Sequence, residues 1–181
     1  MKRAAFLDRD GVLNQTLLES GVPIPPREIS EVHILSGVIE AIRLINDHDF
    51  LPVVITNQPD IGRGISLASD VENVNAVIAS KTGIQHFYVC PHDDAEECKC
   101  RKPKPGLIQQ AAIDLDIEVK SSFLVGDRWK DIASGQAVGL ESYFIDYSYA
   151  EKIPNPPFTR VSSLLEAVTL FFEKEKNGKN E

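Results

Sequence analysis

The chain has 181 residues, and its hydrophobic and charged fractions of 43% and 25% are ordinary for one globular domain. A formal net charge of −8 argues against a general binding surface for nucleic acid, and no apolar run approaches the ~20 residues of a membrane span. We therefore expect a cytoplasmic, monomeric protein that binds neither nucleic acid nor membrane and acts on a small molecule.

Strand-like and helix-like segments alternate along the chain. Strands are predicted over residues 4–7, 51–55, 85–90, 123–125 and 142–145. Helices are predicted over residues 37–47 with Ser36 as cap, from Ser69 or Asp70, from Pro105 as first residue, around residues 132–137, and from Ser162 or Ser163 as cap. Prolines suggest irregular structure over residues 17–34, and the charged residues 173–181 are expected to fray.

This alternation predicts an α/β fold with one parallel sheet between helices. A single domain is expected over residues 1–175, with residues 176–181 as a frayed tail. In such sheets, ligands bind beyond the carboxyl ends of the strands, at the switch point of the topology. Polar residues at predicted strand ends are therefore the first candidates for a site.

Two carboxylates, Asp8 and Asp10, follow the first predicted strand. One interpretation is a site for a hard metal such as Mg²⁺, which binds carboxylate oxygens. Another is two-carboxylate chemistry, with one group as nucleophile and the other as acid and base. A third is a solvated turn that Gly11 closes.

Other strand ends would bring further polar groups to the same edge. Thr56 and Asn57 follow the second predicted strand, and their hydroxyl, amide and backbone N–H groups suit phosphate oxygens. Asp127 follows the fourth and could join Asp8 and Asp10 around Mg²⁺. Asp131 could bind that metal through water, orient another group, or be a helix-start acid favoured by the macrodipole.

Candidate anion-binding cations occur at three places in this acidic chain. Arg63 lies between two glycines and could clamp an anion or remain solvated. Arg101 and Lys102 precede a predicted helix start, a favourable place for an anion. Arg128 and Lys130 flank Asp127, so we expect an electropositive pocket for a phosphate ester.

The three cysteines and one histidine fall within eleven residues, as Cys90, His92, Cys98 and Cys100. An odd, clustered set in a cytosolic chain favours metal binding over disulfides. Three thiolates and one imidazole make a closed tetrahedral zinc site, which leaves no open position for chemistry. We therefore predict a structural zinc-binding loop over residues 90–100.

Four of these segments resemble the motifs of the haloacid dehalogenase (HAD) superfamily. They are Asp8-Arg9-Asp10-Gly11, Thr56-Asn57-Gln58, Arg101-Lys102-Pro103 and Gly126-Asp127 with Asp131 four residues later. The cysteine loop makes the chain similar to the heptose-1,7-bisphosphate 7-phosphatase group, which is close to the histidinol-phosphatase group. The resemblance implies a Rossmann-like fold without a cap domain.

The activity implied by the resemblance is Mg²⁺-dependent hydrolysis of a sugar phosphate monoester, removing the 7-phosphate of heptose 1,7-bisphosphate through an aspartyl-phosphate. The alternative substrates are histidinol phosphate and other small phosphomonoesters. A phosphomutase and a catalytically silent binding module are less favoured.

The resemblance also implies roles for individual residues. Asp8 would be the nucleophile and Asp10 the acid and base, with Thr56 and Lys102 steadying the phosphoryl group. Mg²⁺ would be held by Asp8, Asp127 and the backbone carbonyl of Asp10, with Asp131 acting through water. Substrate binding would involve Asn57, Gln58, Arg63, Arg101 and Arg128, and zinc would bind Cys90, His92, Cys98 and Cys100.

The chain departs from the family pattern at four places. Pro59-Asp60 replaces a Ser-Gly pair, and Asp60 is expected to add negative charge near the substrate pocket. Arg128 stands where a lysine is usual, so a planar bidentate group replaces a point charge. Residues 15–19 do not match the substrate loop, and Asp146-Tyr147-Ser148 replaces an Arg-Thr-Gly loop.

Overall fold

The computed structural model describes residues 1–19 and 22–178 and contains a six-stranded sheet in which every pair of neighbours is parallel. The order is β5-β4-β1-β6-β7-β8. These strands are β1 (Arg3–Leu7), β4 (Phe50–Asn57), β5 (His86–Cys90), β6 (Phe123–Gly126), β7 (Glu141–Ile145) and β8 (Thr159–Val161). The predicted parallel α/β architecture is confirmed.

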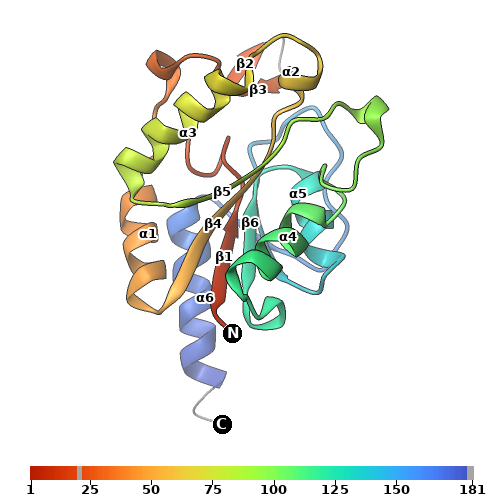
Figure 1. Cartoon of the computed structure of the whole chain (residues 1–181). Helices are drawn as coiled ribbons and strands as arrows, with labels where there is room; N and C mark the ends of the chain where they lie inside the picture. Colours follow the sequence, from red (N-terminus) through yellow and green to blue (C-terminus); the bar gives the residue numbers. More distant parts are fainter. Residues whose placement is uncertain (20–21, 179–181) are drawn as a thin grey trace.

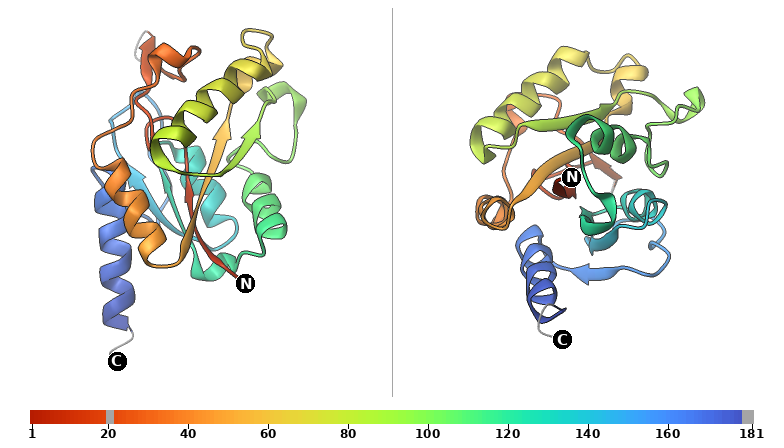
Figure 2. Two further views of the ribbon diagram at one scale, coloured as in Figure 1. Left: turned by 60° about the vertical axis from the view of Figure 1, so that its left-hand side comes forward. Right: turned by 60° about the horizontal axis from the view of Figure 1, so that its bottom comes forward.

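Helices cover both faces of this sheet (Figures 1 and 2). One face carries α1 (Val38–Asp47), α3 (Ala68–Thr82) and α6 (Leu164–Gly178), and the other carries α4 (Gly106–Leu115) and α5 (Trp129–Gln136). Side chains of β1 alternate between the two hydrophobic cores, because Ala5 and Leu7 join one and Ala4 and Phe6 the other. No helix among the described residues combines the length and apolar character needed to cross a membrane.

Residues 17–34 are more ordered than we expected. They contain two short antiparallel strands, β2 (Leu17–Glu19) and β3 (Val22–Ile24), and a 3₁₀ helix, η1 (Ile29–Glu31). The expectation of irregular structure was wrong because each strand of a two-stranded pair has one free edge, where a proline such as Pro23 needs no amide donor. Residues 17–19 and 22–25 are called the β2–β3 arm below.

Outside residues 17–34, three further short helices and one strand were not predicted. The helices are α2 (Pro59–Gly62), η2 (Asp94–Glu96) and η3 (Val119–Ser121), and the strand is β8 at the edge of the sheet. Each is three or four residues long, too short to show a hydrophobic period.

Several predicted helix ends also differ. The N-cap of α1 is Gly37, without a side-chain hydrogen bond, and not Ser36. The N-cap of α4 is Pro105, so this helix starts one residue later than expected. Ser163 does cap α6, because its hydroxyl accepts a hydrogen bond from the Glu166 amide at 3.2 Å.

The tail prediction was wrong for residues 173–178, because α6 continues through Gly178; residues 179–181 lie outside the described residues.

The central strand β1 lies where the chain reverses its direction of travel across the sheet. From β1 the chain adds β4 and β5 on one side, then returns to add β6, β7 and β8 on the other. The carboxyl ends of β1, β4 and β6 thus meet at one edge, the upper edge in Figure 1, where the β2–β3 arm also lies. This edge is the switch point at which a ligand site is expected.

Candidate active site

A cavity opens at this switch point, and most of the predicted site residues line it. Its walls come from the ends of β1, β4 and β6, from the β2–β3 arm and from the start of α5. The lining residues are Asp8, Asp10, Thr16, Pro23, Ile24, Pro25, Thr56, Asn57, Lys102, Asp127, Arg128, Lys130 and Asp131. Gln58, Arg63 and Arg101 are not among them.

Three buried carboxylates form the floor of the cavity. Oxygen atoms of Asp8, Asp127 and Asp131 lie within 4.8 Å of one another. Two of them share the cation Lys102, whose Nζ lies 2.7 Å from Asp8 and 2.6 Å from Asp131. Both carboxylate oxygens of Asp127 are buried and lack a hydrogen-bond partner within the described part of the chain.

This arrangement buries three carboxylates with one ammonium group. Burial raises the pKa of Asp8 to about 7, with Lys102 opposing the shift and Asp131 and Asp10 adding to it. Burial also raises the pKa of Asp127 well above its usual range, and the charges of Asp8 and Asp131 add to the effect. A hard divalent cation would offset this repulsion, and the all-oxygen donor set with the unpartnered Asp127 oxygens fits Mg²⁺.

Asp10 lies beside this group and is held by a separate set of donors. Arg9 is fully buried, and its Nε lies 3.1 Å from each oxygen of the Asp10 carboxylate. Gln58 donates from Nε2 to Asp10 at 2.9 Å and to the Thr56 hydroxyl at 2.8 Å. Gln58 therefore orients Asp10 and Thr56 and is not placed to touch a substrate in the cavity.

The sequence did not single out Arg9 as a site residue. Its guanidinium reaches back to α3, where NH1 donates to the Asn75 side chain at 2.9 Å. The only signal was an arginine at the end of a buried strand, a position where a charge needs a partner.

Lys102 is held at three points. Its Nζ donates to the Ile55 carbonyl at 2.8 Å as well as to the two carboxylates. Its backbone exchanges two hydrogen bonds of 3.0 Å with the Asn57 side chain. Asn57 therefore positions Lys102 in addition to lining the cavity.

Asp131 fills two of the roles that the sequence left open. Its Oδ2 accepts a hydrogen bond of 2.9 Å from the Arg128 backbone amide at the start of α5, as a helix-start acid does. Its Oδ1 orients Lys102.

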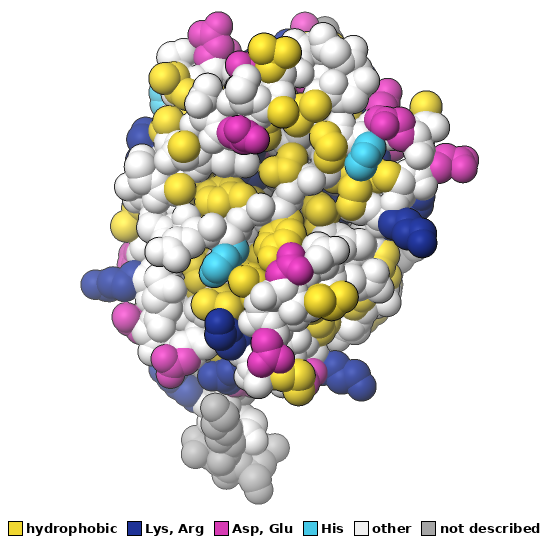
Figure 3. Space-filling view, in the orientation of Figure 1, with side chains coloured by type: hydrophobic (Ala, Val, Ile, Leu, Met, Phe, Trp, Pro, Cys, Tyr) yellow, Lys and Arg dark blue, Asp and Glu magenta, His cyan; other side chains and the backbone are white. Residues whose placement is uncertain are grey.

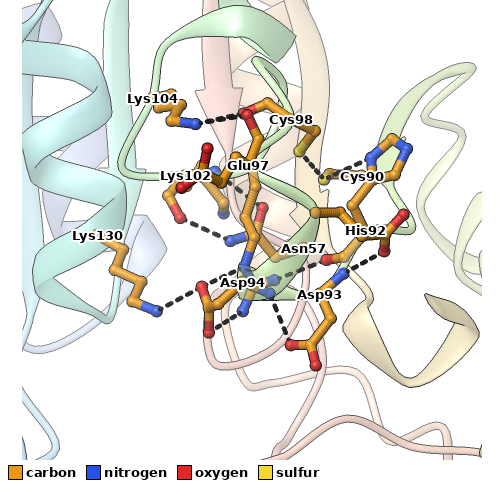
Figure 4. Close-up of polar contacts among 12 residues, drawn as sticks. Asn57, Cys90, His92, Asp93, Asp94, Glu97, Cys98, Lys102, Lys104 and Lys130 are labelled. Carbon is orange, nitrogen blue, oxygen red and sulfur yellow. Dashed lines mark hydrogen bonds and ion pairs between the residues drawn. The ribbon is translucent and has the colours of Figure 1, made fainter. Parts of the chain in front are cut away.

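Most of the predicted substrate-binding cations have acidic partners. Arg63 pairs with Asp93 at 2.7 Å, and Arg101 pairs with Asp94 at 2.7 Å. Arg128 pairs with Glu151 but still lines the cavity. Lys130 also lines the cavity and lies 3.8 Å from Asp94 (Figure 4).

The expectation for Asp60 was wrong. Its carboxylate is buried outside the cavity and pairs with Arg27 at 3.0 Å and with Arg63 at 3.6 Å. Its charge is therefore balanced by two guanidinium groups and is not added to the cavity.

Cys90, His92, Cys98 and Cys100 converge at the start of the loop between β5 and α4. Figure 4 shows the first three of them. The three sulfur–sulfur distances are 3.1, 3.5 and 3.6 Å, and His92 Nδ1 lies 3.2 Å from the Cys100 sulfur and 3.6 Å from the Cys90 sulfur. Thiolates about 2.3 Å from one zinc ion at tetrahedral angles would be roughly 3.7 Å apart. The four groups could therefore hold a single tetrahedral metal ion.

Residues 90–100 are called the Cys–His loop below, and they carry an acidic exterior. Asp94, Glu96 and Glu97 are exposed. Figure 3 shows acidic side chains gathered over this part of the molecule, at its upper right. Attraction of an anionic ligand into the site would therefore depend on the cations that line the cavity.

The segment after β7 closes one side of the site and was not predicted to do so. The Tyr147 hydroxyl donates to the Gly11 carbonyl at 3.0 Å, and the Tyr149 hydroxyl lies 3.2 Å from that of Thr16. Both contacts join residues more than 130 positions apart, so they depend on the folded sheet and leave no local sequence signal.

Known proteins resemble this chain over most of its length. A family model described as HAD-hydrolase-like matches residues 99–159. The D-glycero-beta-D-manno-heptose-1,7-bisphosphate 7-phosphatase of Pasteurella multocida is 33% identical over 153 residues, which cover 78% of this chain and 80% of that protein. The enzyme of the same name from Haemophilus ducreyi is 31% identical over 153 residues, covering 78% and 81% of the two chains.

A solved structure shares the fold. The D,D-heptose 1,7-bisphosphate phosphatase of B. bronchiseptica, crystallised with magnesium and phosphate, superposes with a TM-score of 0.82. The match covers 95% of this chain and 99% of that one, at 22% sequence identity.

Proposed function

The chain belongs to the heptose-1,7-bisphosphate 7-phosphatases of the HAD superfamily, and on that basis we propose that it removes the 7-phosphate of the heptose bisphosphate with the help of Mg²⁺. The observation that carries this proposal is the convergence of Asp8, Asp10, Lys102 and Asp127 on one cavity at the switch point of the sheet. These residue types supply a nucleophile, an acid and base, a cation for the phosphoryl group and a metal ligand.

In the first step, an Asp8 oxygen attacks phosphorus, and the bond from phosphorus to the sugar oxygen breaks. Asp10 gives its proton to the departing oxygen, which leaves as an alcohol. In the second step, Asp10 takes a proton from water as the water oxygen attacks the aspartyl-phosphate, which releases phosphate and restores Asp8. Lys102, which already donates to Asp8, faces the negative charge of the transferring group.

Mg²⁺ bound by Asp8, Asp127 and the Asp10 backbone carbonyl would reduce the repulsion between an anionic nucleophile and an anionic substrate. Asp131 supports this site from beside Lys102. Arg128, Lys130 and Asn57 line the cavity and would contact the rest of the substrate.

We also propose that Cys90, His92, Cys98 and Cys100 bind a structural zinc ion, as their tetrahedral spacing supports. All four ligand positions would be filled by protein, so this metal would take no part in catalysis. Its place in the chain, directly before Arg101 and Lys102, means that it would hold the start of the segment that delivers Lys102 to Asp8. A cytoplasmic, monomeric enzyme that acts only on small molecules stays a prediction.

The substrate can be tested with a panel of phosphate esters. We expect heptose 1,7-bisphosphate to be hydrolysed with a kcat/KM at least about tenfold above those of histidinol phosphate and hexose phosphates, because differential contacts in a polar pocket reach that size. The release of phosphate is measured for each ester with Mg²⁺ present, using both anomers of the bisphosphate. A preference for histidinol phosphate would favour the alternative substrate, and isomerised product without free phosphate would favour a mutase.

A second prediction concerns pH and Mg²⁺. Since the pKa of Asp8 in the folded protein is about 7 and its ordinary value is 3.8, the folded state binds more protons than the unfolded state between these values. The stability of the metal-free protein should therefore fall as the pH rises from about 4 to about 7, by roughly 2–4 kcal/mol. Because Mg²⁺ takes the place of those protons, it should raise Tm by roughly 5 °C more at pH 8 than at pH 5.

Thermal unfolding with Mg²⁺ and with a chelator, at both pH values, measures this difference. The Asp127→Asn variant is the matched control, in which the dependence on Mg²⁺ should largely disappear. An equal effect of Mg²⁺ at pH 5 and pH 8 would contradict the assignment of the carboxylate cluster as its site.

A further inference from the structure

Four side chains of alternating charge connect the β2–β3 arm to the Cys–His loop. Arg27, just after the arm, lies 3.0 Å from an oxygen of Asp60. The other Asp60 oxygen lies 3.6 Å from Arg63, and Arg63 lies 2.7 Å from Asp93 in the Cys–His loop. We call these four residues the ion-pair chain.

Both ends of the ion-pair chain lead to walls of the active-site cavity. At one end, Ile24 and Pro25 of the β2–β3 arm line the cavity and precede Arg27 by three and two residues. At the other end, Asp94 follows Asp93 directly and lies 3.8 Å from Lys130, which also lines the cavity (Figure 4). The ion-pair chain thus joins the β2–β3 arm, which lines the cavity, to the Cys–His loop, which reaches the lining residue Lys130 through Asp94.

Asp60 is the centre of the ion-pair chain and its most buried member. Its side chain is 11% exposed, whereas those of Arg27 and Arg63 are 42% and 40% exposed. Two hydrogen bonds from Arg27, at 3.0 and 3.2 Å, reach the same Asp60 oxygen. The backbone carbonyl of Asp60, a residue of α2, accepts hydrogen bonds from the Ile65 and Ser66 amides, which ties the loop after α2 to the Asp60 backbone.

The neighbouring contacts leave the Asp60 carboxylate without a part in the chemistry. It does not line the cavity, and its side-chain partners among the described residues are Arg27 and Arg63, not Asp8, Asp10 or Lys102. These contacts indicate a role separate from catalysis.

We propose that Asp60 is a positioning residue that sets the β2–β3 arm and the Cys–His loop relative to each other, and so determines which leaving groups the cavity admits. This inference rests on the proposed phosphatase function. Pro25 and Lys130 line the same cavity as Asp8 and Lys102, so the sugar beyond a bound phosphoryl group would contact them, whereas a small ester carries no sugar to do so. Loss of Asp60 should therefore affect binding of a large phosphate ester and leave the reaction of a small one intact.

The kinetic test compares Asp60→Asn with the unmodified enzyme on two substrates. For heptose 1,7-bisphosphate we expect KM to rise roughly fivefold and kcat to change by less than about twofold, within the range of couplings between neighbouring groups. For acetyl phosphate, which is too small to reach either wall, kcat/KM should stay within about twofold. Lys174→Gln is the matched control. It removes a 2.8 Å ion pair to Glu141, at the start of β7, and should leave the kinetic constants for both substrates unchanged.

A second measurement does not depend on turnover. Arg27→Gln should increase hydrogen exchange at the backbone amides of residues 92–97, although the hydrogen bonds of Arg27 within the described residues go to Glu31 and Asp60 and not to that loop. In the Asp60→Asn background the same change at Arg27 should add nothing, because the connection is already broken. The exchange of α4 amides serves as an internal reference for global destabilisation.

The outcomes separate this inference from the proposed function. If the unmodified enzyme hydrolyses acetyl phosphate but not the bisphosphate, the substrate assignment fails, while the exchange experiment still tests Asp60. An unchanged KM in Asp60→Asn, an equal loss on both substrates, or unchanged exchange at residues 92–97 in Arg27→Gln would each overturn the positioning role.

Discussion

Replacing Asp8 with asparagine should abolish turnover while leaving the fold intact. An amide is a far weaker nucleophile than a carboxylate, so we expect kcat to fall by roughly 10⁴-fold or more, as when other covalent nucleophiles are removed. Lys102 keeps its contacts with Asp131 and the Ile55 carbonyl, so the surrounding structure should hold. Phosphate release with Mg²⁺ present measures the loss, and acid-quenched samples should contain phosphoprotein only with the unmodified enzyme.

The stability of Asp8→Asn shows whether activity is lost through the chemistry or through unfolding. Asp8 is a buried carboxylate with a raised pKa, so its charge destabilises the metal-free protein at pH 8. Tm without Mg²⁺ should therefore be unchanged or higher in Asp8→Asn. Asp116→Asn, an exposed change of the same type, is the control and should retain full activity. Undiminished turnover in Asp8→Asn would exclude it as the nucleophile.

The centre of the site could be predicted because it depends only on where the parallel strands end. Each parallel strand ends at the same edge, so Asp8, Thr56 and Asp127 had to meet once the strands were identified. Lys102 was placed by its motif, and the structure brings its Nζ to Asp8 from 94 residues away. These are consequences of chain direction and pleat, which the hydrophobic pattern reveals.

The outer part of the site could not be predicted in this way. Whether Arg63 or Arg101 faces a substrate depends on where Asp93 and Asp94 lie, and these belong to a loop without a periodic pattern. A charged residue in a sequence carries no sign of its partner. Asp60 shows the same limit, because its pair with Arg27 depends on how the β2–β3 arm folds back over α2.

The roles of the buried positioning residues could not be recognised from the sequence for a related reason. Gln58 follows Thr56 and Asn57 in a motif read as substrate-binding, but the residue's side chain turns inward to Asp10. Arg9 lies between Asp8 and Asp10, the two carboxylates to which the sequence analysis assigned roles. It is the fully buried cation that holds Asp10. In both cases the direction of the side chain at a strand end, where the pleat stops, decided the role.

The largest effect on stability is expected from the Cys–His loop. Its only regular element is the single turn η2, and it holds no buried apolar residue between Cys90 and Cys100, so four ligands around one ion would supply much of its order. Cys98→Ser should abolish zinc binding and cost at least about 3 kcal/mol, since the binding free energy of a structural zinc is part of the folding free energy. For a chain of this size, that loss lowers Tm by roughly 10 °C.

Metal analysis and thermal unfolding check this expectation together. Purified protein should contain about one zinc per chain, and Lys99→Ser, an exposed change in the same loop, should retain both the zinc and Tm. A strong chelator should lower Tm of the unmodified protein toward that of Cys98→Ser and leave the variant unchanged.

Because Cys100 directly precedes Arg101 and Lys102, loss of the ion should also release the segment that Asn57 holds, and activity should fall with stability. A zinc-free protein with the same Tm would mean that thiol packing alone maintains the loop that places Lys102.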